Sequence, residues 1–321
     1  MAGRIDGRHV GGNAGAVASR HRQALAERRA TADARGLAPV LRELVDMVNK
    51  NTFPSLGELL FPFPSRRVRR LACSSAHLDR ILLPIIAEHH ATNGNGSDVL
   101  SAMLQMRDER TSRPSMTTTE LRDQIVTFIS AGHETVGNGL TWTWHLLAKH
   151  PEIEAELHAE LDNVLGGRVP NAGDVPRLKF VEAILKESMR LYPPVWVVAR
   201  RTAADFPLGD YIIRAGSYLQ LSPYVTHRDA RYFPDPERFN PHRWTAADTV
   251  RSDRTVYFPF AAGVHKCIGE GLAWAEGILV VATLARTWRF RAAHANHRPC
   301  PEAGITLRPR GGMPMTIHPR S

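Results

Sequence analysis

The feature that most constrains this chain is one cysteine placed just ahead of a long apolar helix. Cys267 lies in the stretch from Phe258 to Glu276, which also carries glycine at positions 263, 269 and 271. A helix start leaves backbone N–H groups without partners and carries a partial positive charge, so a sulfur held there is stabilised as a thiolate. A thiolate suits a soft metal centre, of which haem iron is one. The alternative is a buried structural cysteine, the commoner role for a cysteine taken at random.

Composition sets the size of the core and narrows the partners. The chain has 321 residues, 43% of them hydrophobic, which is enough for one large domain or two ordinary ones. The formal net charge of +9 suits nucleic acid, a membrane surface or an acidic protein partner. No run of lysine and arginine is interleaved with aromatic residues, and no zinc-finger spacing occurs, so nucleic acid is the weakest of the three.

Cysteine usage and hydropathy indicate the compartment. Cys73, Cys267 and Cys300 are widely spaced and odd in number, which predicts no disulfide framework and suits a reducing compartment. The first residues lack the apolar segment of a signal peptide. The sequence contains no run of about 18 apolar residues, so we expect no transmembrane helix. We therefore expect a cytoplasmic monomer. Residues 1–20 are rich in glycine, alanine and arginine, and we expect them to be disordered.

A long helix with a polar interruption is the second informative feature. Thr117 and Glu120 form a capping-box pattern, and Pro151 stops the helix that it opens after roughly 30 residues, or about 45 Å. Ala131-Gly-His-Glu-Thr135 interrupts its apolar middle, where a glycine costs about 1 kcal/mol relative to alanine. One interpretation is a solvated turn of a surface helix. Apolar neighbours on several sides favour a functional reason instead.

The cysteine stretch resembles the haem-ligand loop of the cytochromes P450. The resemblance rests on the spacing Phe260-x-x-Gly263-x-x-x-Cys267-x-Gly269. It implies that Cys267 is the proximal ligand of the iron of haem b and that Phe260 shields its sulfur. The glycines would let the backbone turn beneath the porphyrin. Ala261 stands where the family usually has glycine.

The interrupted helix resembles the distal-helix signature of the same family, Ala/Gly-Gly-x-Glu/Asp-Thr. The resemblance implies that the small residues, Ala131 among them, leave room over the haem. It implies that Thr135 and Glu134 help to deliver protons to iron-bound dioxygen. His133 occupies the variable position and is expected to be a spectator.

Two basic residues match family positions that bind the haem propionates. An extended apolar segment, 194–199, which in the family lines the substrate pocket, is followed by Arg200 and Arg201. One arginine at this point usually pairs with a propionate, and Arg200 is favoured from its distance to Asp205. His265, two residues before the cysteine, stands where the family often has arginine or histidine. For a lone histidine, an ordinary surface position is the competing interpretation.

A third resemblance concerns structure rather than chemistry. Glu187 and Arg190 share a helix face at a spacing of three, as in the Glu-x-x-Arg signature of the family. The resemblance implies that they form a network with Arg243. His242 and Trp244 depart from the usual glutamate and phenylalanine around that arginine.

Apolar periodicity predicts the remaining helices. They are expected at 40–50, 66–90, 99–106, 151–165, 178–191 and 269–288. In the last of these, Leu272, Ile278 and Ala282 are predicted to lie on the buried side. Strands at 211–213 and 218–221 are predicted to form a hairpin turned at 214–217, and a second hairpin is expected around Gly311 and Gly312.

The resemblance covers about residues 59 to 317, and the front portion of the family does not appear in the sequence. It implies a mainly α fold with small β-sheets, an N-terminally truncated cytochrome P450 fold, as one domain over 1–321. It also implies a haem-dependent monooxygenase that inserts one oxygen atom from O2 into a mostly apolar substrate such as a terpenoid or fatty acid. A ferredoxin- or flavodoxin-type donor would supply electrons, with Lys266 as a candidate contact. The alternative is an inactive fragment with poor or no haem binding.

Overall fold

The computed structural model describes residues 66–92, 94, 96, 98–106, 116–245, 256–294 and 298–320. The chain divides into two compact units, Met1–Ser130 and Ala131–Ser321. The predictions for 1–20 and 40–50 lie outside the described residues, and the prediction of one domain stays a prediction. No helix in the described ranges is both long and apolar enough to cross a bilayer.

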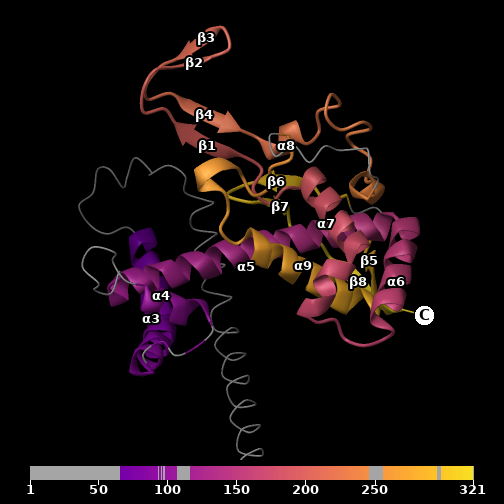
Figure 1. Cartoon of the computed structure of the whole chain (residues 1–321), viewed down its shortest axis with the longest axis horizontal. Coiled ribbons are helices and arrows are strands. Elements are labelled where there is room, and N and C mark those ends of the chain that lie inside the picture. The colour runs from indigo at the N-terminus through magenta and orange to yellow at the C-terminus, as the bar shows by residue number, and fades with distance from the viewer. Residues whose placement is uncertain are drawn as a thin grey trace, which may run out of the picture. The chain divides into compact units, whose positions relative to one another are not determined.

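The first unit consists of helices in its described part. These are α3 (Arg66–Ala91), α4 (Val99–Gln105) and the beginning of α5 (Thr118–Lys149), coloured indigo to magenta in Figure 1. The guanidinium of Arg122 in α5 joins the first two turns of α5 to α3, because its Nε lies 2.6 Å from Asp79 Oδ1 and its Nη2 lies 2.7 Å from Ser75 Oγ.

The predicted capping box at the start of α5 is confirmed. The Thr117 N–H donates to Glu120 Oε2 at 2.7 Å, and the Glu120 N–H donates to Thr117 Oγ1 at 3.2 Å. Two backbone donors at this helix start are thereby satisfied by side chains. The long helix ends at Lys149, just before the proline that was expected to stop it.

The second unit holds the other helices. The longer ones are α6 (Pro151–Leu165), α7 (Lys179–Leu191) and α9 (Glu270–Ala285), and the short ones are α8 (Pro223–Thr226), η1 (Ala172–Arg177), η2 (Pro241–Trp244) and η3 (Gly263–His265). The bounds of α6 are those predicted from its first proline and the glycines that follow it. Helix α9 is shorter than predicted, because the chain leaves it at Ala285 and enters a strand at Trp288.

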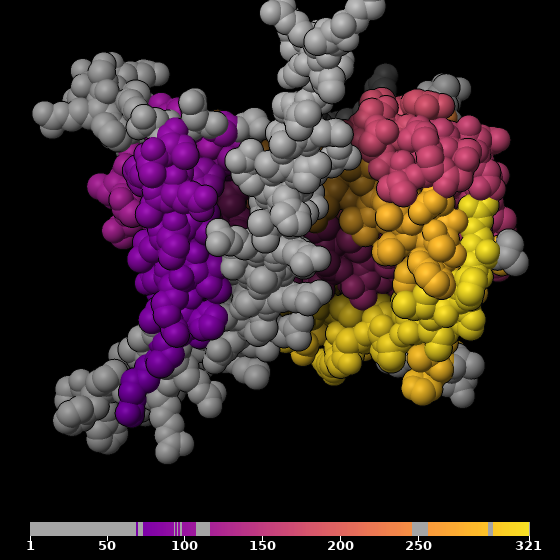
Figure 2. Space-filling view, turned by 90° about the horizontal axis from the view of Figure 1, so that it is seen from below, coloured from indigo at the N-terminus to yellow at the C-terminus, as the bar shows by residue number. Residues whose placement is uncertain are grey.

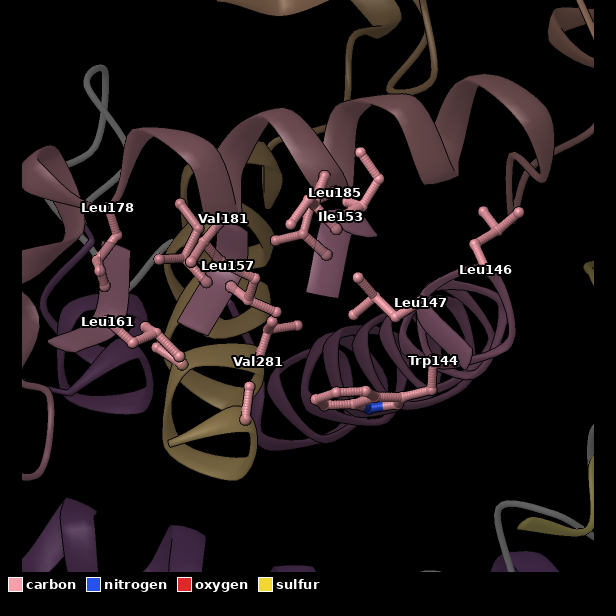
Figure 3. Close-up of a cluster of buried hydrophobic side chains, with 14 of the residues drawn as sticks. Trp144, Leu146, Leu147, Ile153, Leu157, Leu161, Leu178, Val181, Leu185 and Val281 are labelled. Carbon is pink, nitrogen blue, oxygen red and sulfur yellow. The ribbon is translucent and has the colours of Figure 1, made fainter. Parts of the chain in front are cut away.

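The core of this unit lies where the C-terminal half of α5 packs with α6, α7 and α9. Figure 3 shows leucine, isoleucine and valine side chains from these helices pointing toward one another beside Trp144. Ile278 and Ala282 are buried, as predicted. A side chain at Gly277 would place its Cβ 3.2 Å from Leu185 Cδ1, so glycine permits the close approach of α9 to α7.

The β-structure among the described residues is four two-stranded antiparallel sheets. They pair β1 (Val198–Arg201) with β4 (Tyr218–Leu221), β2 (Phe206–Leu208) with β3 (Tyr211–Ile213), β5 (Trp288–Ala292) with β8 (Met315–Pro319), and β6 (Pro301–Ala303) with β7 (Leu307–Pro309). The first two ribbons project away from the helices of this unit (Figure 1). The yellow C-terminal strands lie beside the orange residues of α9 (Figure 2). The prediction of a mainly α fold with small sheets is confirmed.

The predicted hairpin between 211–213 and 218–221 is wrong. Strand β3 pairs with β2 through a tight turn at Gly209, and β4 pairs with β1. The segment 214–217 is a corner between the two ribbons. It is held there because Asp205 accepts hydrogen bonds from the Ala215 N–H and from Arg214, each at 2.7 Å.

The predicted hairpin around Gly311 and Gly312 is also wrong. Strand β8 pairs with β5, placing Phe290 opposite Ile317, while β7 pairs with β6. Phe290 packs against Trp144 with ring centroids 4.3 Å apart. Burial of this strand pair against the helical core, rather than the nearest turn in the sequence, therefore selects the partner of β8.

Candidate functional site

The cysteine loop, residues 258–269, leads directly into α9. Its backbone turns back on itself, because the Cys267 N–H donates to the Phe260 carbonyl at 2.9 Å. Gly263 has φ +74°, in the left-handed region that favours glycine. Gly269 is the N-cap of α9, and a Cβ on it would lie 3.8 Å from the Cys267 sulfur. The predicted position of the cysteine, just ahead of a helix start, is confirmed.

Ala261 departs from the family pattern at a position where the backbone is strained. Its φ is +58°, a left-handed conformation that costs an L-residue about 1–2 kcal/mol. Its N–H donates to the Phe258 carbonyl at 3.0 Å, which closes the turn. The loop therefore adopts a glycine conformation with an alanine in it.

Replacing this alanine by glycine should stabilise the protein. We expect Ala261→Gly to raise the free energy of unfolding by about 0.5–1 kcal/mol, the relief of strain less the extra freedom of glycine in the unfolded chain. Ala262→Gly is the matched control, because Ala262 has φ −148° and carries no such strain. The control should lower stability by about 0.5 kcal/mol. Urea unfolding measures both variants, and a loss of stability in Ala261→Gly would contradict the assignment of strain.

The cysteine loop and the first turn of α9 carry exposed apolar side chains close to Cys267 in the sequence. Cys267 itself is exposed, and Val264, Ile268 and Leu272 have exposed fractions of 97%, 87% and 67%. The prediction that Leu272 lies on the buried side of α9 is therefore wrong, since the first turn of the helix faces away from the core. An apolar surface of this kind marks a binding site.

The donor atoms at this surface fit haem. No group of three or more histidine, cysteine or acidic side chains capable of holding a metal ion occurs among the described residues. One thiol can ligate a metal whose remaining ligands come from an organic group, and a flat porphyrin would cover the exposed apolar residues. The other members of the loop are Phe260, whose ring lies 5.5 Å from Trp274, the exposed His265, and Lys266, which is paired with Glu270.

The interrupted turn of α5 is largely exposed, although apolar residues precede and follow it. Ala131, Gly132 and His133 are exposed, and a Cβ on Gly132 would meet no atom within 4 Å. The Thr135 hydroxyl donates to the Ala131 carbonyl at 2.6 Å. Glu134 accepts a hydrogen bond from Thr306 at 2.7 Å. The open face of this turn leaves room for a bulky neighbour.

Arg200 lies on β1, apart from the carboxylate that follows it in the sequence. Its side chain is exposed and donates to the Ala199 carbonyl at 2.9 Å. Asp205 is paired with Arg214 instead. The next arginine, Arg201, lies over the ring of Tyr218 at 5.8 Å. Arg200 therefore keeps its guanidinium accessible to an anionic group.

Glu187 is the centre of a buried network. Arg190 donates to both of its carboxylate oxygens at 2.9 Å, and both side chains have an exposed fraction of 0%. Arg243 donates to Glu187 at 3.3 Å, as the resemblance implied. The Asn240 N–H and the indole N–H of Trp244 donate to it at 3.0 and 2.9 Å. The departure at position 244 thus adds a donor to the network.

His227 connects this network to the cysteine loop. Its carbonyl accepts from Arg190 at 2.8 Å, and its Nε2 accepts from the Phe258 N–H at 3.1 Å. Burial, aided by the charges of Arg190 and Arg228, lowers the pKa of His227 to about 3. The imidazole is therefore neutral at pH 7, as its acceptor role requires.

Comparison with known proteins decides the family. The model of the family described as Cytochrome P450 matches residues 27–314. The chain belongs to the cytochrome P450 family. This P450 chain is 39% identical over 287 residues to cyclooctat-9-en-7-ol 5-monooxygenase of Streptomyces melanosporofaciens, covering 87% of this chain and 60% of that protein.

Two further relatives have similar identity to this P450 chain. Cyclooctatin synthase of the same organism is 38% identical, covering 81% of this chain and 55% of that protein. Pentalenene oxygenase of Streptomyces avermitilis is 39% identical, covering 64% of this chain and 45% of that protein. The P450 chain spans about half the length of these curated relatives.

The sequence analysis of this P450 chain did not predict three contacts with the candidate residues. Thr306 bonds Glu134, His227 bonds the cysteine loop, and Trp244 bonds Glu187. A threonine or histidine in a loop gives no sequence signal of its partner. Trp244 did give a signal, since it was recognised as a departure from the family pattern.

Proposed function

We propose that this P450 chain binds haem b through Cys267 and acts as a monooxygenase that inserts one oxygen atom of O2 into an apolar organic substrate. The observation that carries the proposal is the single exposed thiol at the start of α9, set among exposed apolar side chains. Bound haem supplies the activation of oxygen and the oxidation of the substrate, and the protein supplies position and protons.

The cysteine loop would hold the cofactor from one side. Cys267 would be the thiolate ligand, with Phe260 beside the sulfur. Gly263 and Gly269 would keep the backbone turns free of side chains that could obstruct the ring. His265 and Arg200 are both exposed basic residues, and we assign them to the two haem propionates.

The central turn of α5 would handle protons. The Thr135 hydroxyl donates a hydrogen bond to the Ala131 carbonyl, so its oxygen lone pairs are left to accept a further hydrogen bond. Glu134 is the adjacent carboxyl group, a residue type that serves in general acid–base catalysis. Ala131 and Gly132 leave this side of the helix open.

The substrate is proposed to be a cyclic terpenoid. The names of two relatives state that those proteins act on cyclooctat-9-en-7-ol and on pentalenene. An apolar substrate of this kind suits the extended apolar segment 194–199, which in the family lines the substrate pocket. Electrons are proposed to come from an acidic ferredoxin- or flavodoxin-type donor, consistent with the net charge of +9. Lys266 remains a candidate contact, and a monomeric, cytoplasmic enzyme remains the expectation.

A carbon-monoxide difference spectrum of the reduced, haem-loaded protein tests the proposal. The absorption band of thiolate-ligated haem is expected. Titration with a cyclic terpenoid alcohol should then shift the haem absorption at lower concentrations than titration with a fatty acid does. Absence of a thiolate band would support the rival interpretation, an inactive fragment with poor or no haem binding.

The role of Thr135 can be tested against a second threonine of the same helix. We expect Thr135→Ala to retain haem but to lower product formed per NAD(P)H consumed at least about tenfold, with the difference released as peroxide. Thr141→Ala is the control, because Thr141, further along α5, makes the same kind of backbone hydrogen bond, to Gly137 at 2.7 Å. Equal coupling in the two variants would remove Thr135 from the proton path.

A further inference from the structure

We propose that Thr306 is a positioning residue that fixes the carboxylate of Glu134 for proton delivery. The proposal rests on the proposed function, because it concerns the same proton path. Thr306 belongs to the turn between β6 and β7, 172 residues from Glu134 in the sequence. Its side chain is nearly inaccessible, with an exposed fraction of 3%.

The hydrogen bonds form a short directed chain. Asn138 Nδ2 donates to Thr306 Oγ1 at 3.0 Å, and Thr306 Oγ1 donates to Glu134 Oε1 at 2.7 Å. Glu134 and Asn138 are four residues apart on α5, so they share a face of the helix. The hydroxyl of Thr306 therefore bridges two side chains of α5 from a different part of the fold.

The chemistry of the groups fixes the direction of this chain. The amide nitrogen of Asn138 can only donate, and an ionised carboxylate can only accept. The Thr306 oxygen must therefore accept from Asn138, which leaves its single proton for Glu134. A hydrogen bond to a carboxylate is charge-assisted and stronger than a neutral one, so the carboxylate is held on this side of α5.

The turn that carries Thr306 is itself held at three points. The indole N–H of Trp142 donates to the Leu307 carbonyl at 3.1 Å, and that of Trp196 donates to the Gly304 carbonyl at 2.8 Å. The Leu307 N–H donates to the Pro194 carbonyl at 2.9 Å. Because hydrogen bonds hold the backbone before and after Thr306, its hydroxyl has a defined position, as the positioning of a reactive group requires.

As a consequence, the two neighbouring side chains of α5 are held by different partners. Thr135 and Glu134 are neighbours in sequence, but the bond from Thr306 draws the carboxylate toward the β6–β7 turn. Glu134 is thereby prevented from rotating freely into solvent. Loss of the Thr306 hydroxyl should leave the Thr135 hydroxyl held as before and release the carboxylate of Glu134 from its position.

A double-mutant cycle between Thr306→Val and Glu134→Gln tests the contact without any need for haem. Urea unfolding of the two single variants and the double variant should give a coupling of about tenfold in the folding equilibrium constant, because hydrogen bonds to charged groups are strong. Thr306→Ser keeps the hydroxyl, so its effect should simply add to that of Glu134→Gln. Additive effects of Thr306→Val and Glu134→Gln would overturn the proposed contact.

The loaded enzyme provides the second measurement. Thr306→Val should lower product formation about tenfold and raise the share of electrons lost as peroxide, since small displacements of a catalytic group are costly. Thr306→Ser should restore both to the values of the unaltered protein. A wild-type peroxide share in Thr306→Val would overturn the positioning role. A missing thiolate–haem band in the unaltered protein would instead refute the proposed function, and the unfolding cycle would still decide the contact.

Discussion

Cys267→Ala is expected to abolish the thiolate–haem absorption band and, with it, turnover. The neighbouring side chains have other proposed or observed partners, since His265 is assigned to a propionate and Lys266 is paired with Glu270. A methyl group cannot replace a thiolate as a metal ligand, so the haem iron would lose its proposed protein ligand. The measurement is the carbon-monoxide difference spectrum of the reduced protein after loading with haem.

Cys300→Ala is the matched control for this substitution. Cys300 is also free and exposed, but its sulfur lies near the Pro301 carbonyl in the strand region rather than at a helix start. The control variant should keep the full band and full activity. Retention of an unchanged spectrum and turnover by Cys267→Ala would refute the haem-thiolate function altogether.

Glu187→Gln should produce the largest loss of stability. The substitution removes the charge that balances Arg190 and leaves that guanidinium buried without its carboxylate. Breaking a buried pair in this way typically costs about 3–5 kcal/mol, more than the pair contributes when compared with apolar residues. It also replaces one carboxylate oxygen by an NH2 group, which removes either the oxygen that accepts from Arg243 or the one that accepts from Trp244. Urea unfolding of the two proteins under the same conditions measures the difference.

Glu182→Gln on the same helix provides the comparison. Glu182 forms ion pairs with Lys186 at 2.8 Å and Lys179 at 3.6 Å on a partly exposed surface. Exposed pairs contribute less than about 1 kcal/mol, so this variant should unfold almost like the unaltered protein. If Glu187→Gln lowered the free energy of unfolding as little as Glu182→Gln does, the buried network would not be a main source of stability.

Some elements followed from local rules. The capping box of α5, the bounds of α6, and the position of Cys267 ahead of α9 were all predicted, because each depends on bonds between residues close in the chain. The strand pairings failed for the opposite reason. Residues 211–213 and 218–221 are good strands with a plausible turn between them, and the corner held by Asp205 sends each to a different partner.

The sequence by itself determined the family, the candidate ligand Cys267 and the long helix with its polar stretch. Their patterns are contiguous in the chain, and backbone geometry and ligand chemistry dictate their residue types. The tertiary structure alone decided which groups support them. It placed the Thr306 hydroxyl on Glu134 and the His227 ring on the cysteine loop, across long separations in the chain. It also revealed that Ala261 adopts a left-handed backbone conformation. Such contacts depend on how helices and strands pack, and one residue's identity does not specify its distant neighbour.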